Sequence, residues 1–246
     1  MAAVYAIVPA AGLGTRMQAG SAPRLAPKQF LLLAGKPILV HTLMALGTVP
    51  ELAGIWIAVR PGEQARLEEL LREHAAELPL RLPTHIVTGG DTRQESVARA
   101  LAAIACDDDD IVLVHDAVRP LVEPAAIDRV VAAVHRFGAA ILALAATDTI
   151  KQVERTAHGA LITATIPRES IVQAQTPQGA RAGLLRRAVA EAEADEFAGT
   201  DEASLLERAG IAVAVVAGAA SNLKITQAAD VPLAEWYLRQ REGDAR

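Results

Sequence analysis

Short runs of apolar residues alternate along the chain with longer segments in which apolar residues recur every three or four positions. The short runs are rich in β-branched residues, as strands are, and the longer segments have the period of amphipathic helices. The predicted strands are VYAIV (4–8), GIWIAV (54–59), HIVT (85–88), IVLVH (111–115) and AAILAL (139–144), with helices predicted at about 37–47, 62–77, 93–105 and 124–136. Strands joined by helices of this length pair in parallel. The pattern therefore predicts an α/β fold, a Rossmann-like, mostly parallel sheet covered by helices on both faces.

Two helix starts carry signals of their own. Thr92 and Glu95 have the spacing of a capping box, and Pro124 suits the first turn of the helix that follows it.

The segment from 147 to 166 departs from this rhythm. Polar and apolar residues alternate on both sides of a predicted turn at His158-Gly159, which indicates a protruding β-hairpin arm over about 147–166. An isolated two-stranded ribbon is marginally stable in water, so we expect the arm to lie on its own domain or on a partner chain. The remaining predicted elements are helices at 181–194 and from about 201, a strand at 212–216 and a terminal helix from about 229. We expect a single domain over residues 1–246.

Composition narrows the function classes. The net charge is −5 and no run is rich in Lys and Arg, which argues against a nucleic-acid surface. No apolar stretch approaches the roughly 18 residues that span a bilayer, and the first residues do not have the pattern of a signal peptide. The single cysteine, Cys106, can form no disulfide within the chain, so we expect a cytoplasmic protein.

The stretch PAAGLGTRM (9–17) follows the first predicted strand and is a candidate phosphate-binding loop. Gly12 and Gly14 let the backbone turn tightly and present N–H groups to a phosphate. It does not match the dinucleotide fingerprint, because Met17 stands in place of the third glycine and Arg60, not an acidic residue, follows the second strand. The Gly-Lys-Ser/Thr of a Walker loop is absent as well.

Cations flank this loop. Arg16 lies within it and Lys28 follows it, and together they could neutralise a triphosphate as negative charge shifts in a transition state. The alternative is a mobile, solvated loop that happens to contain basic residues.

Two further strands end in polar motifs. In TGGDTRQES (88–96), Asp91 and Ser96 stand at a helix start and suit the edge of a base or a ribose, although Asp91 or Thr92 could simply cap the helix. In HDAVRP (115–120), Asp116 emerges at the carboxyl end of its strand, where one carboxylate can share a Mg²⁺ ion with phosphate oxygens. The four aspartates at 107–110 lie at the other end of that strand and indicate a solvated turn.

Other common sites are not indicated. The six histidines lack zinc-binding spacing, and no G-x-S-x-G motif supplies a serine nucleophile. Thr200, Asp201 and Lys224 lie close to predicted turns, where each could be an ordinary cap or surface residue.

Taken together, these motifs resemble a known family. PAAGLGTRM, PKQ (27–29), TGGDTRQES, VHDAVRP, TPQ (176–178), TDEAS (200–204) and NLKIT (222–226) occur in the order found in the 2-C-methyl-D-erythritol 4-phosphate cytidylyltransferases. The resemblance runs from residue 4 to about residue 240. It implies an enzyme of isoprenoid biosynthesis that transfers CMP from CTP to 2-C-methyl-D-erythritol 4-phosphate, with pyrophosphate as the second product.

The resemblance also implies roles for individual residues. Arg16 and Lys28 would contact the CTP phosphates and stabilise the transition state, and Asp116 would bind Mg²⁺. The nucleotide would be held by Ala10, Ala11, Gly12, Gly14, Gly90, Asp91 and Ser96. The methylerythritol phosphate would be held by Arg119, Thr200 and Lys224, together with Thr149 and Arg168 from the arm of a neighbouring subunit, because members of the family are homodimers whose arms clasp each other.

One stretch departs from the family pattern. The spacer between Arg16 and Lys28 is longer than the usual loop and contains an additional Arg24, which either replaces a phosphate contact or points into water. Two alternative functions stay open at this point. One is a cytidylyltransferase for another polyol phosphate such as ribitol 5-phosphate, and the other is a nucleotide-binding regulatory module without catalysis.

Overall fold

The computed structural model describes residues 2–12, 27–78 and 82–244. In this part of the chain the strands are β1 (Val4–Pro9), β2 (Leu32–Leu33), β3 (Lys36–Pro37), β4 (Leu52–Val59), β5 (Thr84–Thr88), β6 (Ile111–Val114), β7 (Ala139–Ala145), β8 (Ile150–Thr156), β9 (Gly159–Ile166), β10 (Val172–Arg181) and β11 (Ala214–Ala217). The helices are α1 (Ile38–Leu46), α2 (Gln64–Glu73), α3 (Arg93–Ala102), α4 (Pro124–Phe137), α5 (Ala182–Ala194), α6 (Glu202–Arg208) and α7 (Asp230–Asp244). None of the described helices has the length and apolar content that crossing a membrane requires.

The main sheet is mostly parallel, as the hydrophobic pattern predicts. Among the described residues its strand order is β11-β7-β10-β6-β1-β4-β5. The pairs of β1 with β4 and β6, of β4 with β5 and of β11 with β7 are parallel, whereas β10 runs antiparallel to both of its neighbours.

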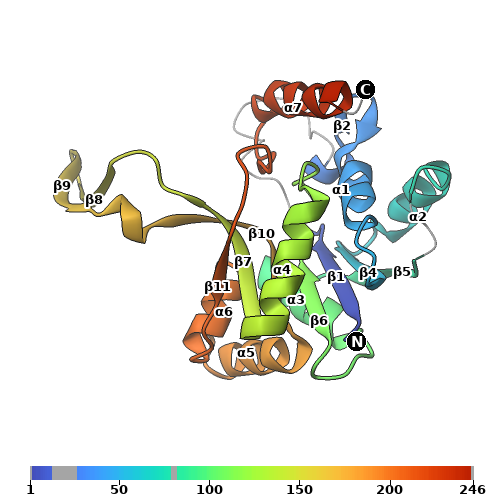
Figure 1. The fold of residues 1–246 in the computed structure, drawn as a ribbon, viewed down its shortest axis with the longest axis horizontal. Coiled ribbons are helices and arrows are strands. Elements are labelled where there is room, and N and C mark those ends of the chain that lie inside the picture. The colour runs from blue at the N-terminus through green and yellow to red at the C-terminus, as the bar shows by residue number, and fades with distance from the viewer. Residues whose placement is uncertain (1, 13–26, 79–81, 245–246) are drawn as a thin grey trace.

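Helices cover both faces of this sheet. Alternate strand residues point to opposite sides, and apolar side chains on both sides are buried under helices. Along β1, Val4, Ala6 and Val8 pack with apolar side chains of α1, α2 and α4, whereas Ile7 packs with those of α3, α5 and α6. Figure 1 shows α4 lying across the sheet, with α5 and α6 together at one end and α7 at the other. The predicted fold class is confirmed.

The order of the strands fixes where a ligand can bind. From β1 the chain passes outward to β4 and β5, and then returns to the opposite side of β1 to form β6. In open α/β sheets the crevice at such a reversal, at the carboxyl ends of the strands, is the usual binding site. Pro9 ends β1, and His115 and Asp116 follow β6 directly, so both motifs meet at this crevice.

Strand β10 is the strand of the main sheet that the hydrophobic pattern missed; the short strands β2 and β3, which pair with each other, were not predicted either. Strand β10 carries three polar side chains in its buried part, Gln175, Thr176 and Gln178, so it lacks the apolar run that indicates a central strand. Hydrogen bonds make this burial possible. The Gln175 amide donates to the Ala219 carbonyl (2.9 Å), and the Gln178 amide donates to Asp201 Oδ2 (2.8 Å) and accepts from the Ala203 N–H (2.9 Å).

The arm is a two-stranded ribbon of β8 and β9 that projects from the body of the molecule (Figure 1). Its turn lies at Ala157-His158, one residue earlier than predicted, and Gly159 already pairs with Thr156 as the first residue of β9. The side chains of Leu161 and Ile162 are both 65% exposed. A ribbon with exposed apolar side chains has the composition of a surface that packs against another molecule.

Candidate active site

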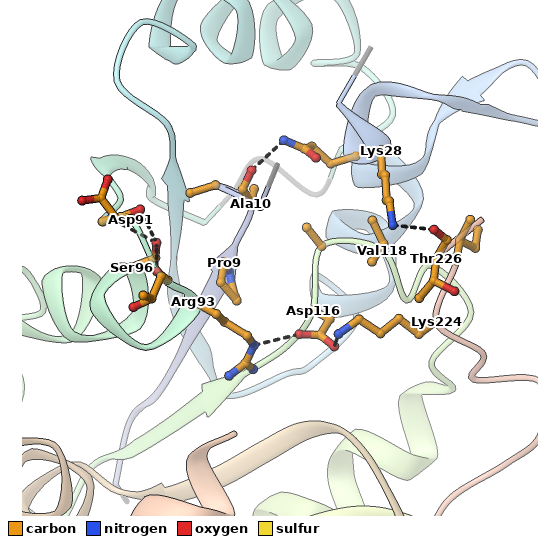
Figure 2. A pocket seen from close by; sticks show the side chains of 17 residues that line it. Pro9, Ala10, Lys28, Asp91, Arg93, Ser96, Asp116, Val118, Lys224 and Thr226 are labelled. Carbon is orange, nitrogen blue, oxygen red and sulfur yellow. Dashed lines mark hydrogen bonds and ion pairs between the residues drawn. The ribbon is translucent and has the colours of Figure 1, made fainter. Parts of the chain in front are cut away.

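A cleft opens at the reversal of strand order, between β1, β5 and β6. Figure 2 shows the side chains that line it, and Lys28 and Lys224 reach it from two separate segments of the chain. The lining residues include Ala10, Ala11, Gly12, Lys28, Gly90, Asp91, Arg93, Ser96, Asp116, Lys224 and Thr226. Nine residues to which the family resemblance assigns a role therefore lie around one cleft.

The glycine turn after β5 shapes one wall of this cleft. A Cβ atom on Gly90 would lie 2.3 Å from Glu95 Cβ, and one on Gly89 would lie 2.8 Å from Ala11 Cβ, so neither position has room for a side chain. The Gly90 N–H donates to Ser96 Oγ (3.1 Å), which ties the turn to the first turn of α3. The turn therefore brings backbone groups close to the cleft, as binding the edge of a nucleotide requires.

The cap of α3 is Thr92. Its side chain accepts from the Glu95 N–H (3.1 Å), as the capping box predicts, but the Glu95 carboxylate accepts from the Asp91 N–H (3.0 Å). The capping function therefore falls to Thr92, and Asp91, which lies at the edge of the cleft, takes no part through its side chain.

The opposite wall comes from the segment after β11. Lys28 Nζ donates to the Thr226 carbonyl, and the Thr226 N–H donates to Asp230 Oδ2 (2.7 Å) at the start of α7. The neighbouring Ile225 is fully buried against Leu33 and Leu121. Packing and hydrogen bonds therefore hold the segment that carries Lys224 at the edge of the cleft.

Asp116 is the electrostatic centre of the site. Its side chain is 8% exposed, and its carboxylate lies 2.8 Å from Lys224 Nζ, 3.2 Å from Arg93 Nε and 3.6 Å from Arg119 Nε. Burial alone would raise the pKa of Asp116, but the positive charges of Arg93, Lys224 and Arg119 outweigh burial and hold this pKa well below its usual range. Asp116 is therefore ionised at neutral pH.

These surroundings bear on the predicted Mg²⁺ site. Both Asp116 oxygens already face cations, and the described residues contain no group of three His, Cys, Asp or Glu side chains that could hold a metal ion. A dication at Asp116 would have to displace Lys224 or lie close to it, at a large cost in repulsion. Among the described residues, the Asp116 carboxylate is therefore already paired with cations, and its role as a Mg²⁺ ligand stays a prediction.

Several residues with roles implied by the resemblance lie away from the lining of the cleft. Arg119 is buried behind Asp116, where its Nη1 donates to the Asn222 carbonyl (2.7 Å). Thr149, Arg168 and Thr200 are exposed, and none of them lines the cleft of its own chain. Gly14, Arg16 and Arg24 lie outside the described residues, so their roles stay predictions.

The structure adds residues that the sequence reasoning gave no role. Arg93 occurs within the TGGDTRQES motif, and its guanidinium binds both Asp116 and the buried Glu202 of the TDEAS motif. His115 precedes Asp116 and is fully buried. Both residues lie within the quoted motifs, which could have marked them as candidates. The spacing of residues in the sequence could not show which side chains face each other.

His115 supports the backbone of the site as a neutral ring. Its Nε2–H donates to the Arg119 carbonyl (3.0 Å), since a carbonyl can only accept. The remaining ring nitrogen, Nδ1, then accepts from the Thr176 hydroxyl (3.1 Å), which in turn accepts from the Asp116 N–H (3.0 Å). Burial lowers the pKa of His115 to about 4, so the ring carries no charge at neutral pH.

This histidine should make folding sensitive to mild acid. The unfolded chain takes up a proton at His115 below about pH 6.5, whereas the folded chain does so only near pH 4, so stability falls as the pH drops between these values. The difference corresponds to a loss of roughly 3 kcal/mol in the free energy of unfolding. Urea unfolding at pH 7.0 and about pH 4.5 should show this loss, and His115→Gln should lose less across the same interval. An unchanged loss in the variant would contradict this role.

Comparison with known proteins shows which family the chain resembles over almost its whole length. The family model described as 2-C-methyl-D-erythritol 4-phosphate cytidylyltransferase matches residues 4–240. The chain belongs to this family. It is 62% identical to the 2-C-methyl-D-erythritol 4-phosphate cytidylyltransferase of Acidobacterium capsulatum, over 97% of this chain and 98% of the relative. The corresponding protein of Solibacter usitatus is 43% identical over 96% of each chain.

Solved structures of cytidylyltransferases share the fold. The 2-C-methyl-D-erythritol 4-phosphate cytidylyltransferase of Thermus thermophilus is 34% identical, with a TM-score of 0.74 over 96% of this chain and 99% of its own. The 4-diphosphocytidyl-2C-methyl-D-erythritol synthase of Anaerococcus prevotii is 26% identical, with a TM-score of 0.80 over 97% of this chain and 99% of its own. The similarity therefore extends over nearly the whole length of both cytidylyltransferase chains.

Proposed function

We propose that this protein transfers CMP from CTP to 2-C-methyl-D-erythritol 4-phosphate and releases pyrophosphate. The observation that carries the proposal is the convergence of Lys28 and Lys224, from distant segments, on a cleft whose other wall is the glycine turn at Gly90. A glycine turn suits a nucleotide edge, and the lysines suit the phosphates of two anionic substrates.

The reaction needs alignment and charge neutralisation more than proton transfer. A phosphate oxygen of the acceptor attacks the α-phosphorus of CTP, and the bond from this phosphorus to the bridging oxygen of the β-phosphate breaks. The second pKa of a phosphate monoester is near 6, so the attacking oxygen is already largely ionised at neutral pH and needs no general base. Lys28 and Arg16 would neutralise the charge that develops on the phosphates, and Lys224 would attract the acceptor phosphate.

Magnesium enters this proposal as a companion of CTP. The triphosphate oxygens would hold the ion, which agrees with the usual small share of protein ligands at Mg²⁺. Asp116 would face the acceptor side of the cleft together with Lys224, at the position that their 2.8 Å contact defines.

The direct test is pyrophosphate release by the purified protein. With CTP and Mg²⁺, we expect rapid release with 2-C-methyl-D-erythritol 4-phosphate and much slower release with ribitol 5-phosphate. Faster release with ribitol 5-phosphate would assign a different acceptor. No release with any polyol phosphate, combined with CTP binding, would leave a nucleotide-binding regulatory module.

We further propose a homodimer in which the arm of each subunit reaches the cleft of the other. In support, Thr149 and Arg168 lie at the base of the exposed arm and do not line the cleft of their own chain. The exposed Leu161 and Ile162 on β9 would gain burial against the partner, since apolar area removed from water stabilises an interface. We also propose that the protein is cytoplasmic, as predicted from the sequence.

Arg168→Ala should raise KM for the methylerythritol phosphate and leave KM for CTP nearly unchanged. The reason is that Arg168 is 55% exposed in its own subunit, where its Nη1 donates to the Thr147 carbonyl (2.9 Å), and would meet only the acceptor phosphate of the partner's site. Steady-state kinetics with each substrate varied in turn measures the two KM values separately. An equal rise in both KM values would contradict it.

Mixed dimers test whether the arm crosses. A dimer of one Lys28→Ala subunit and one Arg168→Ala subunit contains one intact site if the arm crosses, because both lesions then fall in the other site. Mixing the two inactive or weakened homodimers should therefore restore about half of the wild-type activity per mixed dimer. No gain on mixing, with exchange of subunits verified, would show that each arm serves its own chain.

A further inference from the structure

Arg93 links two acidic residues that are far apart in the sequence. Its Nη1 and Nη2 donate to the two carboxylate oxygens of Glu202 (2.7 and 2.9 Å), and its Nε donates to Asp116 Oδ1 (3.2 Å). Figure 2 shows the Arg93 guanidinium and Lys224 Nζ on opposite sides of the Asp116 carboxylate. A planar guanidinium can bind two carboxylates at once in fixed directions, which an ammonium group cannot do.

Glu202 is a rigid support for this arginine. It is 2% exposed, and it is the first residue of α6, whose start is fixed by a capping box between Asp201 and Ser204. The Asp201 carboxylate also accepts from the Gln178 amide (2.8 Å) of β10. The Arg93 guanidinium is therefore held from α6, whose start is tied to the central strand β10.

We propose that Arg93, held by Glu202, is a positioning residue that fixes the Asp116 carboxylate against Lys224 and so aligns the acceptor half of the site. This inference rests on the proposed function, because it concerns the binding of the acceptor. The role of Arg93 and Glu202 is to position Asp116, and the family resemblance implies no role for either residue.

The balance of charge supports this role. Three cations, Arg93, Arg119 and Lys224, surround two carboxylates, Asp116 and Glu202. Without Glu202, the Arg93 guanidinium would be free to turn fully toward Asp116 and to compete with Lys224 for its oxygens. Glu202 therefore limits Arg93 to one contact with Asp116, through Nε, and leaves Oδ2 to Lys224.

A competing explanation is that Arg93 only anchors α3 to α6. Gln94 joins α3 to the loop just before α6, because its side chain donates to the Phe197 carbonyl (3.1 Å) and accepts from the Gly199 N–H (2.8 Å). Neither of these two bonds involves Asp116. A Gln94 variant therefore tests the effect of weaker anchoring of α3 alone. Anchoring alone would also affect CTP, because Asp91 and Ser96 lie in the same motif at the start of α3.

The experiment compares Arg93→Lys, Glu202→Gln and the control Gln94→Ala in the full-length protein. We expect Arg93→Lys and Glu202→Gln to lower kcat/KM for the methylerythritol phosphate by about tenfold or more, since both remove the bidentate support. The dissociation constant for CTP, measured by calorimetry without acceptor, should change by less than about twofold. Gln94→Ala should lower kcat/KM for the acceptor by no more than about threefold, as expected for loss of neutral hydrogen bonds away from the site.

Each other result overturns the inference. Weaker CTP binding in Arg93→Lys and Glu202→Gln, with the same pattern in Gln94→Ala, would mean that Arg93 only anchors α3. Unchanged acceptor kinetics would mean that Asp116 needs no support, and failure of both variants to fold, judged by circular dichroism, would assign Arg93 to stability. If the wild-type protein releases no pyrophosphate with this acceptor, the proposed function itself fails, which is distinct from an active wild type with unaffected variants.

Discussion

Lys28→Ala is expected to lower kcat by at least about 10²-fold, as for the loss of one preorganised group that stabilises transition-state charge. Lys28 begins a short 3-10 helix at the mouth of the cleft, and its Nζ is held at the Thr226 carbonyl. An ammonium group in a fixed position interacts most favourably with the phosphates when negative charge builds up on the leaving pyrophosphate. The effect on KM for CTP should therefore be smaller than the effect on kcat.

Lys36→Ala is the matched control for this experiment. Lys36 lies eight residues further along the chain, pairs with Glu77 at the surface and does not line the cleft. Its loss should leave kcat within about twofold of the wild type, because an exposed ion pair contributes little. Steady-state kinetics of both variants checks the contrast, and a near-normal kcat for Lys28→Ala would remove Lys28 from the reaction.

Asp116→Asn should both destabilise the protein and abolish most of its activity. The variant keeps the shape of the side chain but leaves Arg93, Arg119 and Lys224 without their common anion in a buried site. Removing one partner from a buried ion pair typically costs about 3 kcal/mol or more of unfolding free energy. Urea unfolding at pH 7 measures the loss, and kcat/KM for the acceptor should fall by at least about 10²-fold because Lys224 and Arg93 lose their alignment.

Inorganic pyrophosphate offers a second measurement on the same variant. An anion that enters the cluster should stabilise Asp116→Asn more than the wild type, because it replaces the missing negative charge. Asp109→Asn is the control, since Asp109 is 88% exposed and lies 3.2 Å from Arg181 Nη1 in a surface pair. Equal stability of Asp116→Asn and the wild type would show that the three cations do not depend on this carboxylate.

The hydrophobic pattern predicted most of the fold because most buried strands are apolar throughout. All side chains of β6, for example, are buried, and Ile111 to Val114 form an unbroken apolar run. The pattern failed at β10, where Gln175, Thr176 and Gln178 are buried through hydrogen bonds to segments distant in sequence. Burial that depends on partners far along the chain leaves no local period for a sequence pattern to detect.

The site was predictable to the extent that its residues lie in recognisable turns. Gly90, Asp91 and Asp116 follow the ends of strands. Because parallel strands end at the same edge of a sheet, the sequence could predict that these residues lie near one another. The pairing of Arg93 with Glu202 was not foreseeable, because 109 residues separate them and only the folded chain brings the first residues of α3 and α6 together. The family resemblance supplied the roles of Thr149 and Arg168, which no pattern in a single chain could indicate.

The place of β10 in the sheet has a consequence for synthesis on the ribosome. β10 lies between β6 and β7, although both emerge before it, so a nascent chain that ends before Val172 holds two sheet fragments with facing open edges. Unpaired edges of this kind are prone to pair with other chains. Until β10 enters the gap, neither Thr176 nor Gln178 is in place behind the site, so a stalled nascent chain should require chaperone protection and should not yet hold nucleotide.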